Sequence, residues 1–148
     1  MFARRIVKYL VVIALLLGGG SGFAQSLIDS SVKLFSKVEV FAFGGVGYAG
    51  QTSAGEIDFK TILSLPPQDA LAVFEKLVVT GNPQAKAYAL SGMRKINPRR
   101  FQELFVVAEE SREDVAVMRG CVLTTESLRD VAEKIDRGEW DLYLKRDR

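Results

Sequence analysis

The sequence predicts a mainly α-helical protein with a small β element, an α+β class in which antiparallel helical hairpins pack as one compact domain. Helix-start signals and amphipathic stripes recur through most of the chain, whereas only two short stretches are typical of strands. The length of 148 residues allows one domain with a substantial core and is too short for two.

Two central helices begin with the same dipeptide. Asn82 precedes Pro83, and Asn97 precedes Pro98. An asparagine at the N-cap accepts a hydrogen bond from a free backbone N–H, and proline fits the first helical position. The two starts are about 15 residues apart, which is the length of one ordinary helix with its connection. We therefore expect an antiparallel helical hairpin over 81–110.

The first helix of this hairpin has a face of small residues. Ala85, Ala89 and Gly92 share one side at about 100° per residue, while Ser91 falls on the opposite, solvent side. Small residues let a neighbouring helix approach closely, and Tyr88 would fill the flank of that contact. The second helix has an apolar stripe at intervals of three and four, which consists of Phe101, Leu104, Phe105 and Ala108.

Further helices are expected on both sides of the central pair. Apolar spacing, proline starts and glycine stops mark them. They cover 26–38, 56–65, a segment from Pro66-Pro67 to the stop at Gly81, and a last helix that is N-capped by Thr125 and ends at Gly138.

Two segments are expected to form strands. Residues 39–43 are rich in strand-forming side chains, and 115–124 partly alternate, so the two could pair, with Gly120 at a bulge. Cys121 has apolar neighbours and is expected to be a small buried hydrophobe. Trp140, in a tail that docks back on the domain, is expected in the core, with an interface anchor as the alternative.

Residues 1–24 have the pattern of a secretory signal peptide. Three basic residues within the first eight positions precede an apolar run over 9–17, and small residues follow before Gln25. The run is shorter than the roughly 20 residues that a membrane-spanning helix needs. We expect cleavage before Gln25, a periplasmic or secreted protein, and contact with the membrane only through the leader. An uncleaved anchor is the alternative.

The remaining segment, 25–148, is predicted to be a single mainly helical domain. Removing Arg4, Arg5 and Lys8 from a formal charge of +2 leaves −1. A nearly neutral exported domain lacks the clustered positive charge that binds nucleic acid, so no nucleic-acid partner is expected. One cysteine gives no internal disulfide, and packing must stabilise the fold.

The glycine-rich loop 44–55 is the first place to look for a binding site. It contains the pattern G-x-G-x-x-G over 45–50, but no helical stripe or βαβ unit follows, so nucleotide binding is not favoured. Long loops with aromatic and hydroxyl side chains often bind partners, although a purely structural loop is the alternative. The candidate binding residues in and next to this loop are Tyr48, Gln51, Thr52, Ser53 and Glu56.

The composition excludes much catalytic chemistry. The chain has no histidine, which removes Ser-His and Cys-His pairs and histidine zinc sites. No catalytic residue, metal ligand or cofactor is assigned. A carboxylate pair of Glu39 and Glu56, which flank the glycine-rich loop, is the remaining enzymatic arrangement.

These observations favour a small exported binding module of the cell envelope, of an inhibitor or immunity type, with a protein partner there. The alternatives are an envelope hydrolase that uses the carboxylate pair and a structural accessory protein without a discrete site.

Overall fold

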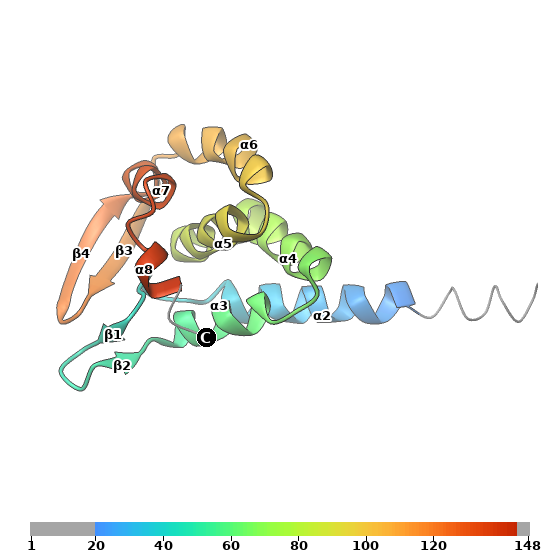
Figure 1. Cartoon of the computed structure of the whole chain (residues 1–148), viewed down its shortest axis with the longest axis horizontal. Coiled ribbons are helices and arrows are strands. Elements are labelled where there is room, and N and C mark those ends of the chain that lie inside the picture. Colours follow the sequence, from blue (N-terminus) through green and yellow to red (C-terminus); the bar gives the residue numbers. More distant parts are fainter. Residues whose placement is uncertain (1–19, 145–148) are drawn as a thin grey trace, which may run out of the picture.

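The computed structural model describes residues 20–144. Within them the fold is mainly α-helical with two small antiparallel two-stranded sheets, as predicted (Figure 1). The predicted leader covers residues 1–24, of which 1–19 lie outside the described residues. The backbone of the first described helix spans the predicted cleavage site before Gln25, and cleavage stays a prediction. None of the helices within 20–144 combines the length and the apolarity needed to cross a membrane.

The helices follow one another with short connections, except where the hairpins intervene. Their bounds are α2 (Gly20–Phe35), α3 (Ala54–Leu63), α4 (Pro67–Thr80), α5 (Pro83–Ile96), α6 (Pro98–Glu109), α7 (Leu128–Asp136) and α8 (Asp141–Leu144).

The Asn-Pro starts are confirmed in atomic detail. The Asn82 side chain accepts a hydrogen bond from the Ala85 backbone N–H at 2.8 Å, and the Asn97 side chain accepts one from Arg100 N–H at 3.1 Å. The predicted cap of the last helix is wrong by two residues. Ser127 caps α7, because the preceding strand continues through Thr125 to Ser127 and the helix therefore begins only at Leu128.

Helix α5 is the centre of the domain. It contacts α3, α4, α6, α7 and the strand β3 (Asp114–Arg119). A Cβ added at Gly92 would lie 2.3 Å from the Phe74 ring, so α4 packs directly on the α5 backbone, as the small-residue face predicts. Ser91, predicted to face solvent, is buried, and its hydroxyl donates to Ala87 O at 3.0 Å. Neighbouring elements enclose α5 at Ser91, whereas Lys95 on the same predicted polar side is exposed.

The strands form two hairpins. β1 (Gly45–Val46) pairs with β2 (Gln51–Thr52), and β3 (Asp114–Arg119) pairs with β4 (Val122–Ser127). The prediction of one strand over 115–124 is therefore wrong. Gly120, with φ of 59°, makes a two-residue turn with Cys121 instead of a bulge, because positive φ is what tight hairpin turns require.

The predicted pairing of 39–43 with the later strand is confirmed at one residue. Phe41 N–H donates to Ala116 O at 2.8 Å, and Met118 N–H donates to Phe41 O at 3.0 Å, in a parallel bridge. The segment does not continue as a regular strand. At the next residue, Ala42, the backbone N–H and C=O bond to the side chain of Tyr88 on α5 and not to a strand.

The Tyr88 hydroxyl satisfies both backbone groups of Ala42. It accepts from Ala42 N–H at 2.9 Å and donates to Ala42 O at 2.6 Å. The Ser53 hydroxyl lies 3.2 Å from the same hydroxyl and also donates to Ala42 O. The Tyr88 ring contacts four other rings at centroid distances of 4.8 to 5.8 Å, those of Phe35, Phe41, Phe43 and Phe59. Tyr88 is thus a central core residue and not only a flank.

Replacing Tyr88 with phenylalanine should destabilise the protein by about 1–3 kcal/mol, because the buried Ala42 N–H would lose its acceptor. Urea unfolding of Tyr88→Phe against the wild type measures the difference. Tyr48→Phe is the matched control, since the Tyr48 side chain is fully exposed and lies outside the core. Equal stabilities of Tyr88→Phe and the wild type would contradict the role given to this hydroxyl.

Alkaline pH should remove part of this stabilisation. Burial raises the pKa of Tyr88 to about 12, whereas a tyrosine in an unfolded chain ionises near 10. Between these values the unfolded chain has lost a proton that the folded chain keeps, so a rise in pH favours unfolding. The contribution is complete below about pH 10 and is lost as the pH rises through about 12. The stability advantage of the wild type over Tyr88→Phe, measured by urea unfolding, should shrink across this window. A stability difference between the wild type and Tyr88→Phe that does not change with pH would argue against a raised pKa of Tyr88.

Candidate binding site

The two hairpins are joined to each other at one end of the molecule. Gly47 N–H, at the tip of β1–β2, donates to Gly120 O, in the turn of β3–β4, at 2.9 Å. Val46 and Gly120 form a parallel bridge at the same place. Both hairpins lie on the same side of the domain, away from α4 (Figure 1). The two turns therefore form a single connected surface.

Glycine backbone geometry positions Tyr48 at the tip of β1–β2. Gly47 and Gly50 have φ of 68° and 60°, values that other residues rarely adopt, and Gly50 N–H donates to Gly47 O at 3.1 Å. This closes a tight turn around Tyr48 and Ala49. The Tyr48 side chain is fully exposed.

The structure divides the predicted binding residues into two groups. Tyr48, Gln51 and Thr52 are exposed on the hairpin. Ser53 and Glu56 are buried and have structural partners. The Ser53 hydroxyl accepts from Glu56 N–H at 3.1 Å and caps α3.

Glu56 fixes the other end of the glycine-rich loop. Its Oε2 accepts from Gly44 N–H at 2.8 Å, and its Oε1 pairs with Lys60 at 3.2 Å. Both carboxylate oxygens are therefore engaged, and the side chain is buried. Glu39 is exposed. This arrangement gives Glu56 a role in holding the loop on α3.

The prediction that Cys121 is buried is wrong. The thiol is exposed in the β3–β4 turn, because its apolar neighbours belong to a hairpin that projects from the domain and not to a central strand. Val122 and Leu123 are exposed beside it. Tyr48, Cys121, Val122 and Leu123 together are called the tip surface below.

Cys121 should react with a maleimide in the folded protein at a rate within about tenfold of that in denaturant, because no local opening is required. It is the only cysteine, so labelling is followed by intact mass. Cys121→Ser is the blank. Protection by about 100-fold or more in the folded protein would show that the turn is covered.

A pocket of about 310 Å³ lies next to the tip surface. It is bounded by the start of β1, the turn of β3–β4 and the C-terminal segment that contains α8. Its lining residues are Phe43, Gly45, Arg119, Gly120, Glu139, Trp140 and Tyr143. Three aromatic rings and one arginine therefore meet in one small cavity.

The aromatic walls of this pocket are fixed by packing. Trp140 is only 5% exposed, and its ring lies 5.0 Å from that of Phe41 in an edge contact. Tyr143 packs on Gly44, where an added Cβ would lie 2.7 Å from the Tyr143 ring. The prediction of a tail that docks on the core is confirmed for Trp140, which also lines the pocket.

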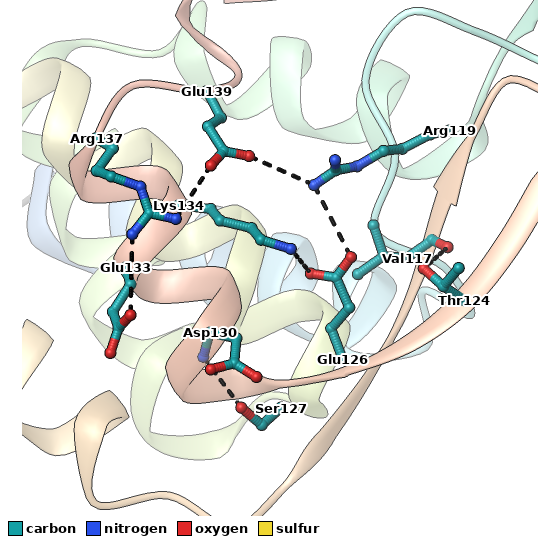
Figure 2. Close-up of polar contacts among 10 residues, drawn as sticks. All are labelled: Val117, Arg119, Thr124, Glu126, Ser127, Asp130, Glu133, Lys134, Arg137 and Glu139. Atoms are coloured by element: carbon teal, nitrogen blue, oxygen red, sulfur yellow. Dashed lines mark hydrogen bonds and ion pairs between the residues drawn. The ribbon is translucent and has the colours of Figure 1, made fainter.

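Arg119 extends from the end of β3 over the Trp140 ring, with its guanidinium carbon 5.2 Å from the ring centroid. It forms ion pairs with Glu139 at 3.6 Å and Glu126 at 3.9 Å. Figure 2 shows Arg119 and Arg137 directed at Glu139 from opposite sides. The side chain of Arg119 is half-exposed, so one part of it is packed and another part is open to solvent.

Charged residues of alternating sign continue from Arg119 along β4 and α7. Glu126 accepts from Lys134 at 2.6 Å, Glu139 accepts from Arg137 at 3.1 Å, and each of these contacts is visible in Figure 2. Glu133 pairs with Arg137 and with Arg129. The whole network is called the charge chain, and its order is Arg129, Glu133, Arg137, Glu139, Arg119, Glu126 and Lys134.

Sequence reasoning missed Arg119, Glu139 and Tyr143 as pocket residues. Arg119 is 20 or more positions away from Glu139 and Tyr143 in the sequence, and neither stretch contains a known motif. The only local signal was the cluster of aromatic residues around Trp140 in the tail. Within residues 20–144, moreover, no group of three or more Cys, Asp or Glu side chains is arranged to hold a metal ion.

No family model, curated protein or solved structure matches this chain.

Proposed function

We propose that this protein is a small binding module that captures a protein partner with its tip surface. The observation that carries the proposal is the full exposure of Tyr48 on a turn that is bonded to the β3–β4 turn, which leads into exposed Val122 and Leu123 at the start of β4. We further propose that the predicted leader directs this module to the cell envelope or outside the cell, where an inhibitor or immunity-type role fits its size.

The composition of the tip surface supports protein binding. Single exposed apolar residues are ordinary, but here Tyr48, Val122 and Leu123 are exposed at the ends of two hairpins that are bonded to each other, where burial against a partner would be favourable. Tyrosine is enriched among the residues that contribute most to interfaces, since it combines a large apolar ring with a polar hydroxyl.

The tip surface is also held in place before any partner binds. The Gly47–Gly120 hydrogen bond joins its two turns, and Glu56 anchors the beginning of the loop at Gly44. A surface that is already ordered loses less conformational entropy on association. This is the arrangement expected of an inhibitor-like loop that enters a partner's site.

Tyr48→Ala should weaken partner capture by about 30-fold or more, which is the effect of removing an interface hot spot, and leave the thermal midpoint nearly unchanged. The tagged protein is used as bait in cell-envelope extracts, and companions are identified by mass spectrometry. Val79→Ala is the control, because Val79 is also a large exposed hydrophobe, at 76%, but lies on α4.

Undiminished capture by Tyr48→Ala would contradict the proposal. A bait that returns alone would favour the structural accessory alternative. The intact mass of the same bait tests the predicted cleavage before Gln25.

A further inference from the structure

We propose that the pocket beneath the tip surface binds a carboxylate that is attached to a flat apolar group, with Arg119 receiving the carboxylate. This inference goes beyond the capture of a protein by the tip surface. The same chemistry occurs in a small aromatic acid and in the C-terminal residue of a peptide, and the experiment below distinguishes the two.

Arg119 has hydrogen-bonding capacity that the described part of the chain does not use. Its contacts with Glu139 and Glu126, at 3.6 and 3.9 Å, are ion pairs beyond hydrogen-bond distance. An arginine has five N–H donors in a planar fork that matches the two oxygens of a carboxylate. The guanidinium of Arg119 therefore lines the pocket with donors that a ligand can occupy.

The cation–π contact with Trp140 also prepares Arg119 for this role. With its carbon 5.2 Å from the ring centroid, the guanidinium is attracted to the aromatic face and held at the pocket. Less side-chain freedom is then lost when a ligand binds.

The charges around Arg119 leave it available to a small anion. The two glutamates near Arg119 each have a second cationic partner, since Glu126 accepts a hydrogen bond from Lys134 and Glu139 accepts one from Arg137. In the pocket lining itself, Arg119 is the cation and Glu139 is the anion. A monoanionic carboxylate therefore meets less repulsion there than a doubly charged phosphate would.

The size and the walls of the pocket define the rest of the ligand. A volume of about 310 Å³ is at the lower limit of ligand pockets, so it admits one side chain or a small acid. Phe43, Trp140 and Tyr143 line the pocket. Phe43 and Trp140 are each 5% exposed, so the half-buried Tyr143 offers most of the ring surface to a flat apolar group.

The test uses the fluorescence of Trp140, which is the only tryptophan of the chain and lines the pocket. N-acetyl-phenylalanine is titrated into the full-length protein, and N-acetyl-phenylalaninamide, which lacks the carboxylate, is the matched probe. We expect a saturable change with the acid and at least tenfold weaker binding of the amide. Equal binding of the two probes, or no saturation with the acid up to about 10 mM, would overturn the proposal.

Variants locate the carboxylate. Arg119→Gln should weaken binding of the acid by about 10- to 100-fold, since a charged hydrogen-bonding partner is lost, and Arg119→Lys should weaken it less because the charge remains. Arg129→Gln is the control, as Arg129 is at the far end of the charge chain and does not line the pocket. Thermal unfolding verifies that each variant is folded. Unchanged affinity in both Arg119 variants would overturn the assignment.

A third titration separates the two sources of the carboxylate. A tetrapeptide that ends in phenylalanine is compared with its C-terminal amide. Binding of the free-acid peptide about tenfold tighter than N-acetyl-phenylalanine supports a peptide C-terminus, whereas equal or weaker binding supports a small aromatic acid. The titrations contain no protein partner, so their failure would leave the capture by Tyr48 unaffected, and the reverse also holds.

Discussion

The hydrogen bonds between the Tyr88 hydroxyl and Ala42 connect the helical core to the end of the molecule that contains the two hairpins. Phe41, one residue earlier, bonds to β3, and Gly44, two residues later, bonds to Glu56 on α3. The short segment between α2 and the glycine-rich loop is thus attached to three elements within four residues. The Tyr88 side chain satisfies the buried backbone groups of Ala42. The segment can therefore cross the core with β3 as its only neighbouring strand among residues 20–144.

The candidate binding surface depends on this attachment. The segment that Tyr88 holds continues directly into β1, and β1 leads to the turn that presents Tyr48. Trp140 packs on Phe41 of the same segment and provides one wall of the pocket. The tip surface and the pocket therefore both adjoin the segment that is bonded to Tyr88. They involve different residues and different proposed ligands.

Local signals predicted the local structure, and long-range pairing limited the rest. The caps at Asn82 and Asn97 need only the residues around them, so the sequence was sufficient for α5 and α6. A glycine in an alternating stretch is compatible with a bulge and with a turn, and only the partner strand decides. For this reason the β3–β4 turn was missed at Gly120, and Cys121 was assigned to the interior. The glycine-rich loop contained exposed candidates, but the involvement of Ser53 and Glu56 in structural contacts and the approach of Arg119 to Trp140 depend on residues far apart in the chain.

The separation of Ala42 and Tyr88 has a consequence for the order of folding. The two residues are 46 positions apart, whereas α4 and α5 are joined by a short connection. Closing the larger loop costs more chain entropy, so we expect the α4–α5 pair to form first and the hairpin end to assemble on it afterwards. Under native conditions we expect the exposed turns at Tyr48 and Cys121 to open locally, with backbone amides that exchange with solvent before those of the buried helix α5. Such opening would leave the core in place, including the buried β3 residues Val115 and Val117.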